Sequence, residues 1–272
     1  MNLVSQIVRM PQKKTITLGK SLDLLELFGE VGTSLTVKEI CQRSSLPEST
    51  VYRYINTLSE RDYLEYDPAA QKYRLGVNLI KLGNIAMRQL EIHRCCYPIM
   101  EDLARQTGET VTLTVRKGNS AIVIEVVDSG RSGIKLAMNR GDNLPLYLCA
   151  ITRPLVAFLQ EEEVDSILHG DPPKLFTTYT LTDLVKIRGE LQKVKHQGYS
   201  YSAQQLTIGA AGLGAPIWDF SEKVVGSLSL VGPLSSFEKS SVPSLLKFLL
   251  EASRECSMKM GFSSPKVGGL QK

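Results

Sequence analysis

Long apolar runs, a secretory leader and paired cysteine motifs are all absent from this 272-residue sequence. No uninterrupted apolar stretch approaches the roughly 18 to 20 residues that a membrane-spanning helix needs, and the amino-terminal segment lacks the apolar core and cleavage site of a secretory signal. We therefore predict a cytoplasmic protein with no membrane partner. Its five cysteines are scattered and form no C-x-x-C pair, so neither a disulfide framework nor a four-cysteine zinc site is indicated.

Metal-binding and catalytic patterns are missing too. The three histidines, His93, His169 and His196, show no H-E-x-x-H or H-x-x-x-H spacing, so we predict no metal site. A nucleophile elbow, a Ser-x-x-Lys pair and a diagnostic Cys, His and Asp arrangement are lacking, so no catalytic residue is assigned and no enzyme is expected. The run I-G-A-A-G-L-G-A-P opens a predicted strand without the Lys-Ser or Lys-Thr of a phosphate loop. We predict no nucleotide or other cofactor.

Neither sign of charge is in large excess. The sequence holds 32 Lys and Arg against 28 Asp and Glu, and this net charge of +4 permits an anionic partner without requiring one. With 43% hydrophobic and 22% charged residues, the chain suits two compact domains. Residues 1–15 are predicted to be a flexible basic arm carrying Arg9, Lys13 and Lys14, and residues 261–272, with little to bury, a disordered tail.

Residues 16–76 predict three helices and a hairpin. Leu18, Leu22, Leu25 and Phe28 recur at helical spacing, and Thr36 with Glu39 forms a capping box before the second helix. Pro47 stands where a first helical residue would, and alternating aromatic and charged residues surround a turn after the third helix. The predicted helices cover 18–28, 37–43 and 47–61, with hairpin strands over 63–66 and 71–75.

An amphipathic helix over 77–90 is predicted to link this domain to a second one over 91–260, where strands and helices alternate. The second domain is therefore mixed, and the fold class is α+β. Its predicted helices cover 93–107, 149–159, 182–195 and 241–260, and its strands 111–115, 122–126, 134–138, 212–218 and 224–231.

The strongest functional signal is the stretch L-T-V-K-E-I-C-Q-R-S-S-L-P-E-S-T-V-Y-R-Y-I-N-T-L, two helices and a short turn that precede the hairpin. This is the plan of a winged helix-turn-helix, whose second helix enters the DNA major groove with its polar face. Arg53 can pair with guanine or phosphate, and hydroxyls near the helix start can donate to phosphate. Each residue is also interpretable as solvated surface. The candidate DNA-binding residues are Thr36, Lys38, Ser49, Thr50, Tyr52, Arg53, Lys72 and Arg74.

Over residues 16–258 the sequence resembles the IclR family of bacterial transcription regulators. The resemblance rests on L-P-E-S-T-V-Y-R-Y-I-N-T-L, Y-R-L-G, T-G-E-T-V-T-L, L-P-L-Y, Q-G-Y-S-Y-S, G-A-P-I-W-D and V-V-G-S-L-S, in that order. It implies a winged helix-turn-helix joined by a linker helix to a GAF-like α/β effector-binding domain, in dimers or tetramers on operator DNA. A homodimer would give the apolar stripe of the linker helix a partner.

The resemblance also implies that a small acid effector is held by segments matching 134–151, 202–213 and 227–231. Several positions depart from the family pattern: Tyr147 replaces a frequent His, Gly212 a cysteine, Gln204-Gln205 an acidic pair, and Val231 the second serine after Ser229. Because these changes remove polar anchors, we expect a more hydrophobic or aromatic effector. The candidate effector residues are Leu136, Met138, Leu144, Ala150, Ile151, Ser202, Ala210, Gly212, Ser229 and Val231. Leu136, Met138 and Leu144 are equally interpretable as ordinary core.

The sequence thus predicts a one-component regulator that binds double-stranded operator DNA as a homodimer or homotetramer and is modulated by a small organic effector. Two alternatives stay open: a ligand sensor whose winged helix engages a protein partner, and an enzyme that uses the GAF-like pocket.

Overall fold

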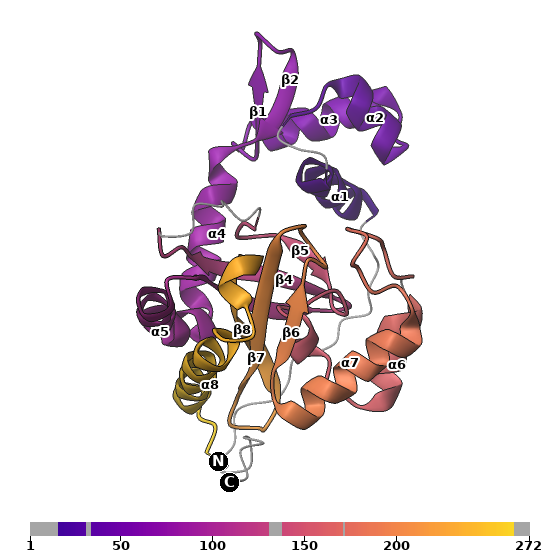
Figure 1. Ribbon diagram of the computed structural model, residues 1–272. Helices are drawn as coiled ribbons and strands as arrows, with labels where there is room; N and C mark the ends of the chain where they lie inside the picture. Colours follow the sequence, from indigo (N-terminus) through magenta and orange to yellow (C-terminus); the bar gives the residue numbers. More distant parts are fainter. Residues whose placement is uncertain (1–15, 31–33, 131–137, 171, 264–272) are drawn as a thin grey trace, which may run out of the picture. The chain divides into compact units, whose positions relative to one another are not determined.

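The computed structural model describes residues 16–30, 34–130, 138–170 and 172–263. The chain divides into two compact units between Ala86 and Met87, within helix α4 (Figure 1). Each unit has its own apolar core. None of the helices in the described ranges combines the length and hydropathy that a membrane crossing requires.

The amino-terminal unit is the predicted three helices and hairpin. Helix α2 begins with the predicted capping box, because the Thr36 side chain accepts from the Glu39 N–H while the Glu39 side chain accepts from the Thr36 N–H. Helix α3 begins one residue later than predicted, since Pro47 is its N-cap. The core is built from Leu24, Phe28, Leu35, Ile40, Val51, Tyr54, Ile55 and Leu64. The elements are α1 (Ile16–Glu30), α2 (Val37–Ser44), α3 (Glu48–Ser59), β1 (Leu64–Asp67), β2 (Lys72–Leu75) and α4 (Val77–Gln89).

The carboxy-terminal unit is a six-stranded antiparallel sheet in the order β5-β4-β3-β8-β7-β6. Its elements are α5 (Glu91–Thr107), β3 (Thr110–Lys117), β4 (Ser120–Val127), β5 (Asn143–Pro145), η1 (Arg153–Leu155), α6 (Glu161–Gly170), α7 (Leu184–Gln197), β6 (Ser200–Ala203), β7 (Ala210–Trp218), β8 (Val224–Pro233), η2 (Leu234–Phe237) and α8 (Val242–Lys259).

Both faces of this sheet are covered. Helices α5 and α8 pack on one face, where Leu213, Leu228 and Leu230 enter their core, and Figure 1 shows α6 and α7 on the other side. On that second face the turns around η1 pack against β7 and β8, and Val231 enters a separate core. Side chains of β8 alternate between the two faces, with Leu228 and Leu230 on the first and Val231 on the second.

The helix predicted over 149–159 is wrong. This segment forms turns and the short 3₁₀-helix η1, in which Pro154 stands near the start. The cause is Pro154, because proline cannot donate the backbone hydrogen bond of a helix interior and would stand in the middle of the predicted helix.

Other expectations need smaller corrections. The apolar stripe of α1 is divided, because Leu24 and Phe28 are buried whereas Leu18 and Leu22 are 60% and 53% exposed. Of the strand predicted over 134–138, residues 134–137 lie outside the described residues, and Met138 belongs to no strand. The basic arm of residues 1–15 and residues 264–272 of the tail also lie outside them.

Candidate DNA interface and ligand cavity

Helix α3 separates its buried and exposed faces sharply. Val51, Tyr54 and Ile55 are buried in the core, while Tyr52 and Arg53 point to solvent. Because exposed and buried positions alternate at helical spacing, one helix both anchors itself in the core and presents polar side chains outward. This exposed face is available to a groove of duplex DNA.

The predicted residues of α3 lie on or beside that face. Ser49 is exposed and Thr50 is half-buried near the start of the helix. The Arg53 guanidinium lies 5.6 Å from the centre of the Tyr54 ring, so an aromatic surface supports its charge. Asn56 is exposed on the same face and was not predicted, although it follows Arg53 by three residues and helical spacing alone would have found it.

Thr36 and Lys38 flank the start of α2. The Thr36 hydroxyl donates to the Glu39 carboxylate at 2.8 Å, and the Thr36 N–H donates to the same oxygen at 2.7 Å. These two bonds lower the pKa of Glu39, with the backbone bond the larger cause. The hydroxyl of Thr36 is therefore committed to the capping box, whereas the Lys38 side chain is exposed.

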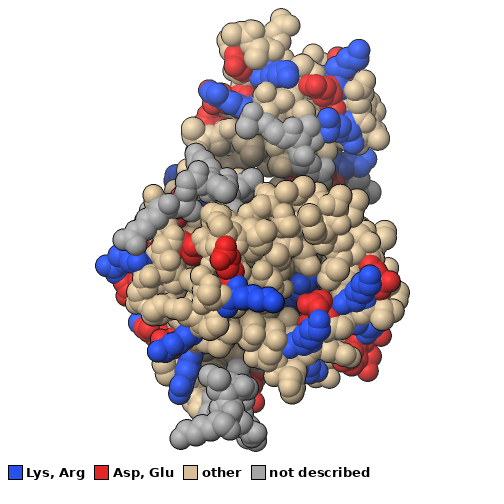
Figure 2. Space-filling model, in the orientation of Figure 1, with Lys and Arg blue, Asp and Glu red and all other residues tan. Residues whose placement is uncertain are grey.

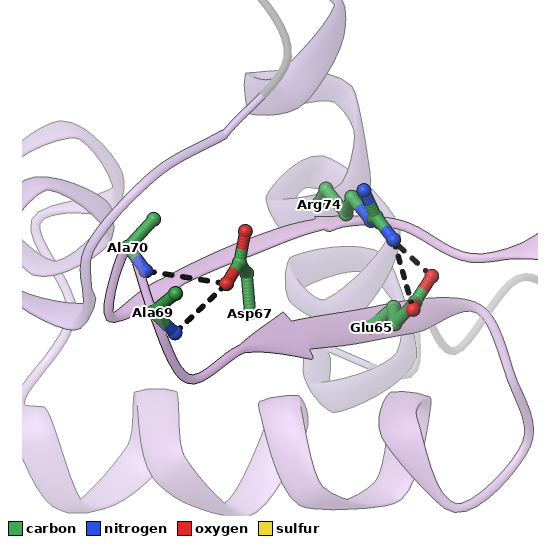
Figure 3. A network of polar contacts seen from close by, with 5 residues as sticks. All are labelled: Glu65, Asp67, Ala69, Ala70 and Arg74. Carbon is green, nitrogen blue, oxygen red and sulfur yellow. Dashed lines mark hydrogen bonds and ion pairs between the residues drawn. The ribbon is translucent and has the colours of Figure 1, made fainter.

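The hairpin that forms the wing carries an ion pair. Arg74 on β2 donates to both carboxylate oxygens of Glu65 on β1, at 2.9 and 3.2 Å, and Asp67 accepts the N–H groups of Ala69 and Ala70 at the turn (Figure 3). The hydrogen bond to Arg74 lowers the pKa of Glu65. A phosphate would have to compete with Glu65 for the Arg74 guanidinium.

Charge of both signs surrounds these elements. On the face shown in Figure 2, basic and acidic side chains of the amino-terminal unit are interspersed, and no broad patch of one sign forms. Lys72 is half-buried at the start of β2, next to the turn of the hairpin, and lies opposite Asp67 of β1. The placement of individual cations, and not the total charge, therefore has to determine any contact with DNA.

The carboxy-terminal unit holds a cavity enclosing about 430 Å³ of space outside the protein atoms, its opening to solvent included. It lies where the turns before η1 meet the loop between β6 and β7. Its walls are formed by Met138, Cys149, Ala150, Ile151, Ser202, Gln204, Gln205, Leu206, Thr207, Ala210, Ala211, Gly212 and Val231.

The structure brings many of the predicted effector residues together here. Those that line the cavity are Met138, Ala150, Ile151, Ser202, Ala210, Gly212 and Val231. Leu144 lies on β5 in the core of the second sheet face, and Ser229 is buried on β8 with its hydroxyl 3.3 Å from that of Ser227. Neither is among the lining residues, and Leu136 lies outside the described residues.

Contacts from β6 and β7 determine where Ala150 lies. Its N–H donates to the Ser202 hydroxyl at 2.9 Å, and its carbonyl oxygen accepts from the Ser200 hydroxyl at 2.5 Å. A Cβ at Gly214 would lie 2.1 Å from that carbonyl oxygen. The absence of a side chain on β7 therefore allows the cavity wall to approach the sheet.

Sequence reasoning missed part of the lining: Cys149, Gln204, Gln205, Leu206, Thr207 and Ala211. The two glutamines were noticed only as departures from a family pattern. The sequence signal that could have identified this part of the lining is the run Q-Q-L-T-I-G, because its glycine indicates a turn. In the structure this turn has a positive φ of 60° at Gln204 and of 79° at Gly209.

Burial raises the pKa of the Cys149 thiol, which therefore stays protonated in the cavity wall.

Behind Gln205 lies Arg153, which is 1% exposed. Its guanidinium donates to the carbonyl oxygens of Tyr147 and Leu148, both at 3.1 Å, and to Oε1 of Gln205 at 2.6 Å. Burial lowers the pKa of Arg153.

Within the described ranges, no group of three or more His, Cys, Asp or Glu side chains could hold a metal ion.

Comparison with known proteins finds relatives that match both the amino-terminal and the carboxy-terminal unit. Residues 17–68 match the model of the IclR helix-turn-helix domain, and residues 85–258 match that of the bacterial transcriptional regulator IclR C-terminal region. The chain is 31% identical to the HTH-type transcriptional regulator KipR of Bacillus subtilis, over 93% of this chain and 100% of that protein. It is also 28% identical to XynR of Escherichia coli, over 89% of this chain and 96% of that protein.

Solved structures give the same result. The structure of an IclR transcriptional regulator from Alicyclobacillus acidocaldarius has a TM-score of 0.82 and 26% identity, covering 91% of this chain and 100% of that one. An IclR homolog from Microbacterium hydrocarbonoxydans, complexed with 4-hydroxybenzoate, has a TM-score of 0.76 and 24% identity, with coverage of 91% and 100%. The fold predicted from the sequence, a winged helix-turn-helix with a second α/β domain, is confirmed, and the chain belongs to the IclR family of bacterial transcriptional regulators.

Proposed function

We propose that the protein binds double-stranded operator DNA through the exposed face of α3 and that a small organic effector in the cavity of the carboxy-terminal unit modulates this binding. The main support for DNA binding is that Val51, Tyr54 and Ile55 of α3 are buried while Tyr52 and Arg53 are exposed to solvent. The cavity supports the proposed effector site, because it is a concave site with mainly apolar walls. We propose no catalytic role for it.

We propose two types of DNA contact, one to base edges and one to phosphates. Arg53 and Tyr52 would face base edges, while Ser49 and Thr50 would contact phosphate at the start of α3. Contacts from Lys38, Lys72 and Arg74 would add phosphate binding from α2 and the wing, with Thr36 acting through the capping box that begins α2. Within this scheme we retain the domain boundaries of 16–76, 77–90 and 91–260.

A homodimer, or a tetramer built from dimers, is proposed as the binding species. Two exposed apolar surfaces support it: Leu18 and Leu22 on α1, and Val77, Ile80, Leu82 and Ile85 on α4. Apolar side chains exposed along consecutive turns of a helix are typical of a surface that a partner covers. A symmetric dimer would place two α3 helices on two half-sites.

The effector is proposed to occupy the cavity, as a small molecule with an apolar body. The 4-hydroxybenzoate in the Microbacterium hydrocarbonoxydans homolog supports an aromatic candidate. The described lining offers Met138, Ile151, Leu206 and Val231 to such a body.

The first test is the substitution Arg53→Ala. We expect affinity for an operator fragment, selected from genomic DNA with the wild-type protein, to fall by at least about fivefold, because each bidentate contact to a base contributes about 1–3 kcal/mol. A gel shift measures it, and circular dichroism establishes that the fold is retained. Arg254→Ala is the matched control, because Arg254 is exposed on α8 and is expected to have no effect.

Two results would contradict the proposal. One is unchanged operator affinity of the Arg53 variant. The other is an affinity that stays constant between 50 and 200 mM salt, since a protein engaging six or more phosphates should lose on the order of 10³-fold over that range. Failure to select any DNA would instead favour a winged helix that engages a protein partner.

A further inference from the structure

The hairpin of the amino-terminal unit has two chemically different faces, because successive residues of a strand point to opposite sides. Glu65 and Arg74 are paired in register and lie on one face, where they form an ion pair (Figure 3). Tyr66 and Tyr73 are the next pair in register and lie on the other face. The first face therefore neutralises its own charge, whereas the second carries uncharged phenol groups.

The tyrosine face is the one that packs beside the core of this unit. Leu64, two residues before Tyr66, is 2% exposed in that core, and Tyr73 is half-buried against it. The ring centres of Tyr66 and Tyr73 lie 4.9 Å apart with a tilt of 46°, within the range that aromatic pairs favour. Tyr66 itself is 46% exposed. Its ring is therefore supported on one side and open to solvent on the other.

Tyr52 of α3 brings the exposed face of the helix close to this pair. It is 45% exposed and directly precedes Arg53. Burial is the main cause that raises the pKa of Tyr73, and the phenols of Tyr66 and Tyr52 raise it further. Both side chains therefore lie within electrostatic range of the same ring. The open side of Tyr66 is thus beside the helix face that carries Arg53.

The hydroxyl of Tyr66 is available to a ligand, since none of the described residues forms a hydrogen bond with it. A phenol stays protonated at neutral pH and offers a donor without carrying charge. Phosphate oxygens of DNA accept hydrogen bonds from tyrosine side chains. The neighbouring carboxylate of Glu65 lies on the opposite face and is bound to Arg74, so it does not oppose an anion at Tyr66.

We propose that the Tyr66 hydroxyl donates a hydrogen bond to a phosphate at the edge of the groove that α3 occupies, so that the wing contacts the DNA backbone through a neutral side chain. This inference rests on the proposed function, namely that the exposed face of α3 binds operator DNA. It adds a residue that was not among the candidates from the sequence. The contact orients the wing on the duplex and carries no sequence information by itself.

The variant Tyr66→Phe removes the hydroxyl and keeps the ring. We expect affinity for the selected operator fragment, measured by gel shift, to fall by at least about fivefold, because hydrogen bonds to an ionised group are the stronger ones. The salt dependence should keep its slope, since a neutral hydroxyl releases no counterion, whereas Lys38→Ala should lower the slope by about one. Tyr179→Phe, the same change at a position 53% exposed in the carboxy-terminal unit, should alter neither.

A second measurement locates the contact on the DNA. Operator fragments that each carry one methylphosphonate, in which a neutral methyl group replaces a charged oxygen, are titrated with the wild-type protein and with Tyr66→Phe. At the phosphate bound by Tyr66, the substitution should weaken the wild-type protein about threefold or more beyond its effect on the variant, because the variant has already lost that hydrogen bond. Circular dichroism establishes that both proteins have the same fold.

Unchanged affinity of Tyr66→Phe, or methylphosphonate effects that are the same for both proteins at every position, would overturn the proposal. A loss of affinity in Tyr66→Ala without one in Tyr66→Phe would also overturn it, because the ring and not the hydroxyl would then make the contact. In each of these cases operator binding that depends on Arg53 would leave the proposed function intact. A protein that selects no DNA at all would disprove both.

Discussion

Gly214 shows how one residue can determine the position of a binding-site wall. We expect Gly214→Ala to destabilise the protein by roughly 1–3 kcal/mol, because the added Cβ would lie 2.1 Å from the Ala150 carbonyl oxygen and backbone yields poorly. Chemical denaturation measures the loss. Gly189→Ala is the control: a Cβ there meets nothing within 4 Å on helix α7, so it should be neutral or stabilising by about 0.5–1 kcal/mol. Equal stability of the two variants would disprove the claim that the missing side chain at Gly214 lets Ala150 pack against β7.

At the scale of the element, the capping box of α2 is the clearest case. Thr36→Ala should destabilise the amino-terminal unit by about 1 kcal/mol, because it removes the hydroxyl that accepts the Glu39 N–H at 3.2 Å. Thr36→Ser, which keeps a hydroxyl, should recover most of that loss. Thermal unfolding followed by circular dichroism checks it. If the serine variant were as unstable as the alanine variant, the methyl group and not the cap would be the stabilising part.

At the scale of the whole molecule, a charged side chain introduced on α4 tests the proposed dimer surface. Ile80 is 66% exposed, so Ile80→Glu should leave the chain folded while shifting its mass by light scattering toward the monomer and weakening operator binding. Val185→Glu, at a position 79% exposed on α7, is the matched control and should not change the mass. An unchanged oligomer in the Ile80 variant would place the interface elsewhere.

Local patterns predicted the amino-terminal unit well, since its helices are amphipathic and begin with recognisable caps. Thr36 and Glu39 identified the start of α2, and Pro47 identified the start of α3 to within one residue. Polar and apolar residues alternate there because one side of each helix faces water. Residues 149–157 show no such contrast, since tertiary packing buries all of them, Thr152 and Arg153 included, and the conformation of the segment was mispredicted.

The order of apolar, polar and turn-forming residues along the chain was therefore enough to indicate two folded units, the helix that presents Arg53, and the strands β7 and β8. Only the tertiary structure showed that Arg153 donates a hydrogen bond to Gln205, and that Gln205 lines the same cavity as Ala150. The physical reason is sequence separation: periodicity reports which way a side chain faces within its own element, whereas a contact between residues 153 and 205 depends on how distant segments pack against the same sheet.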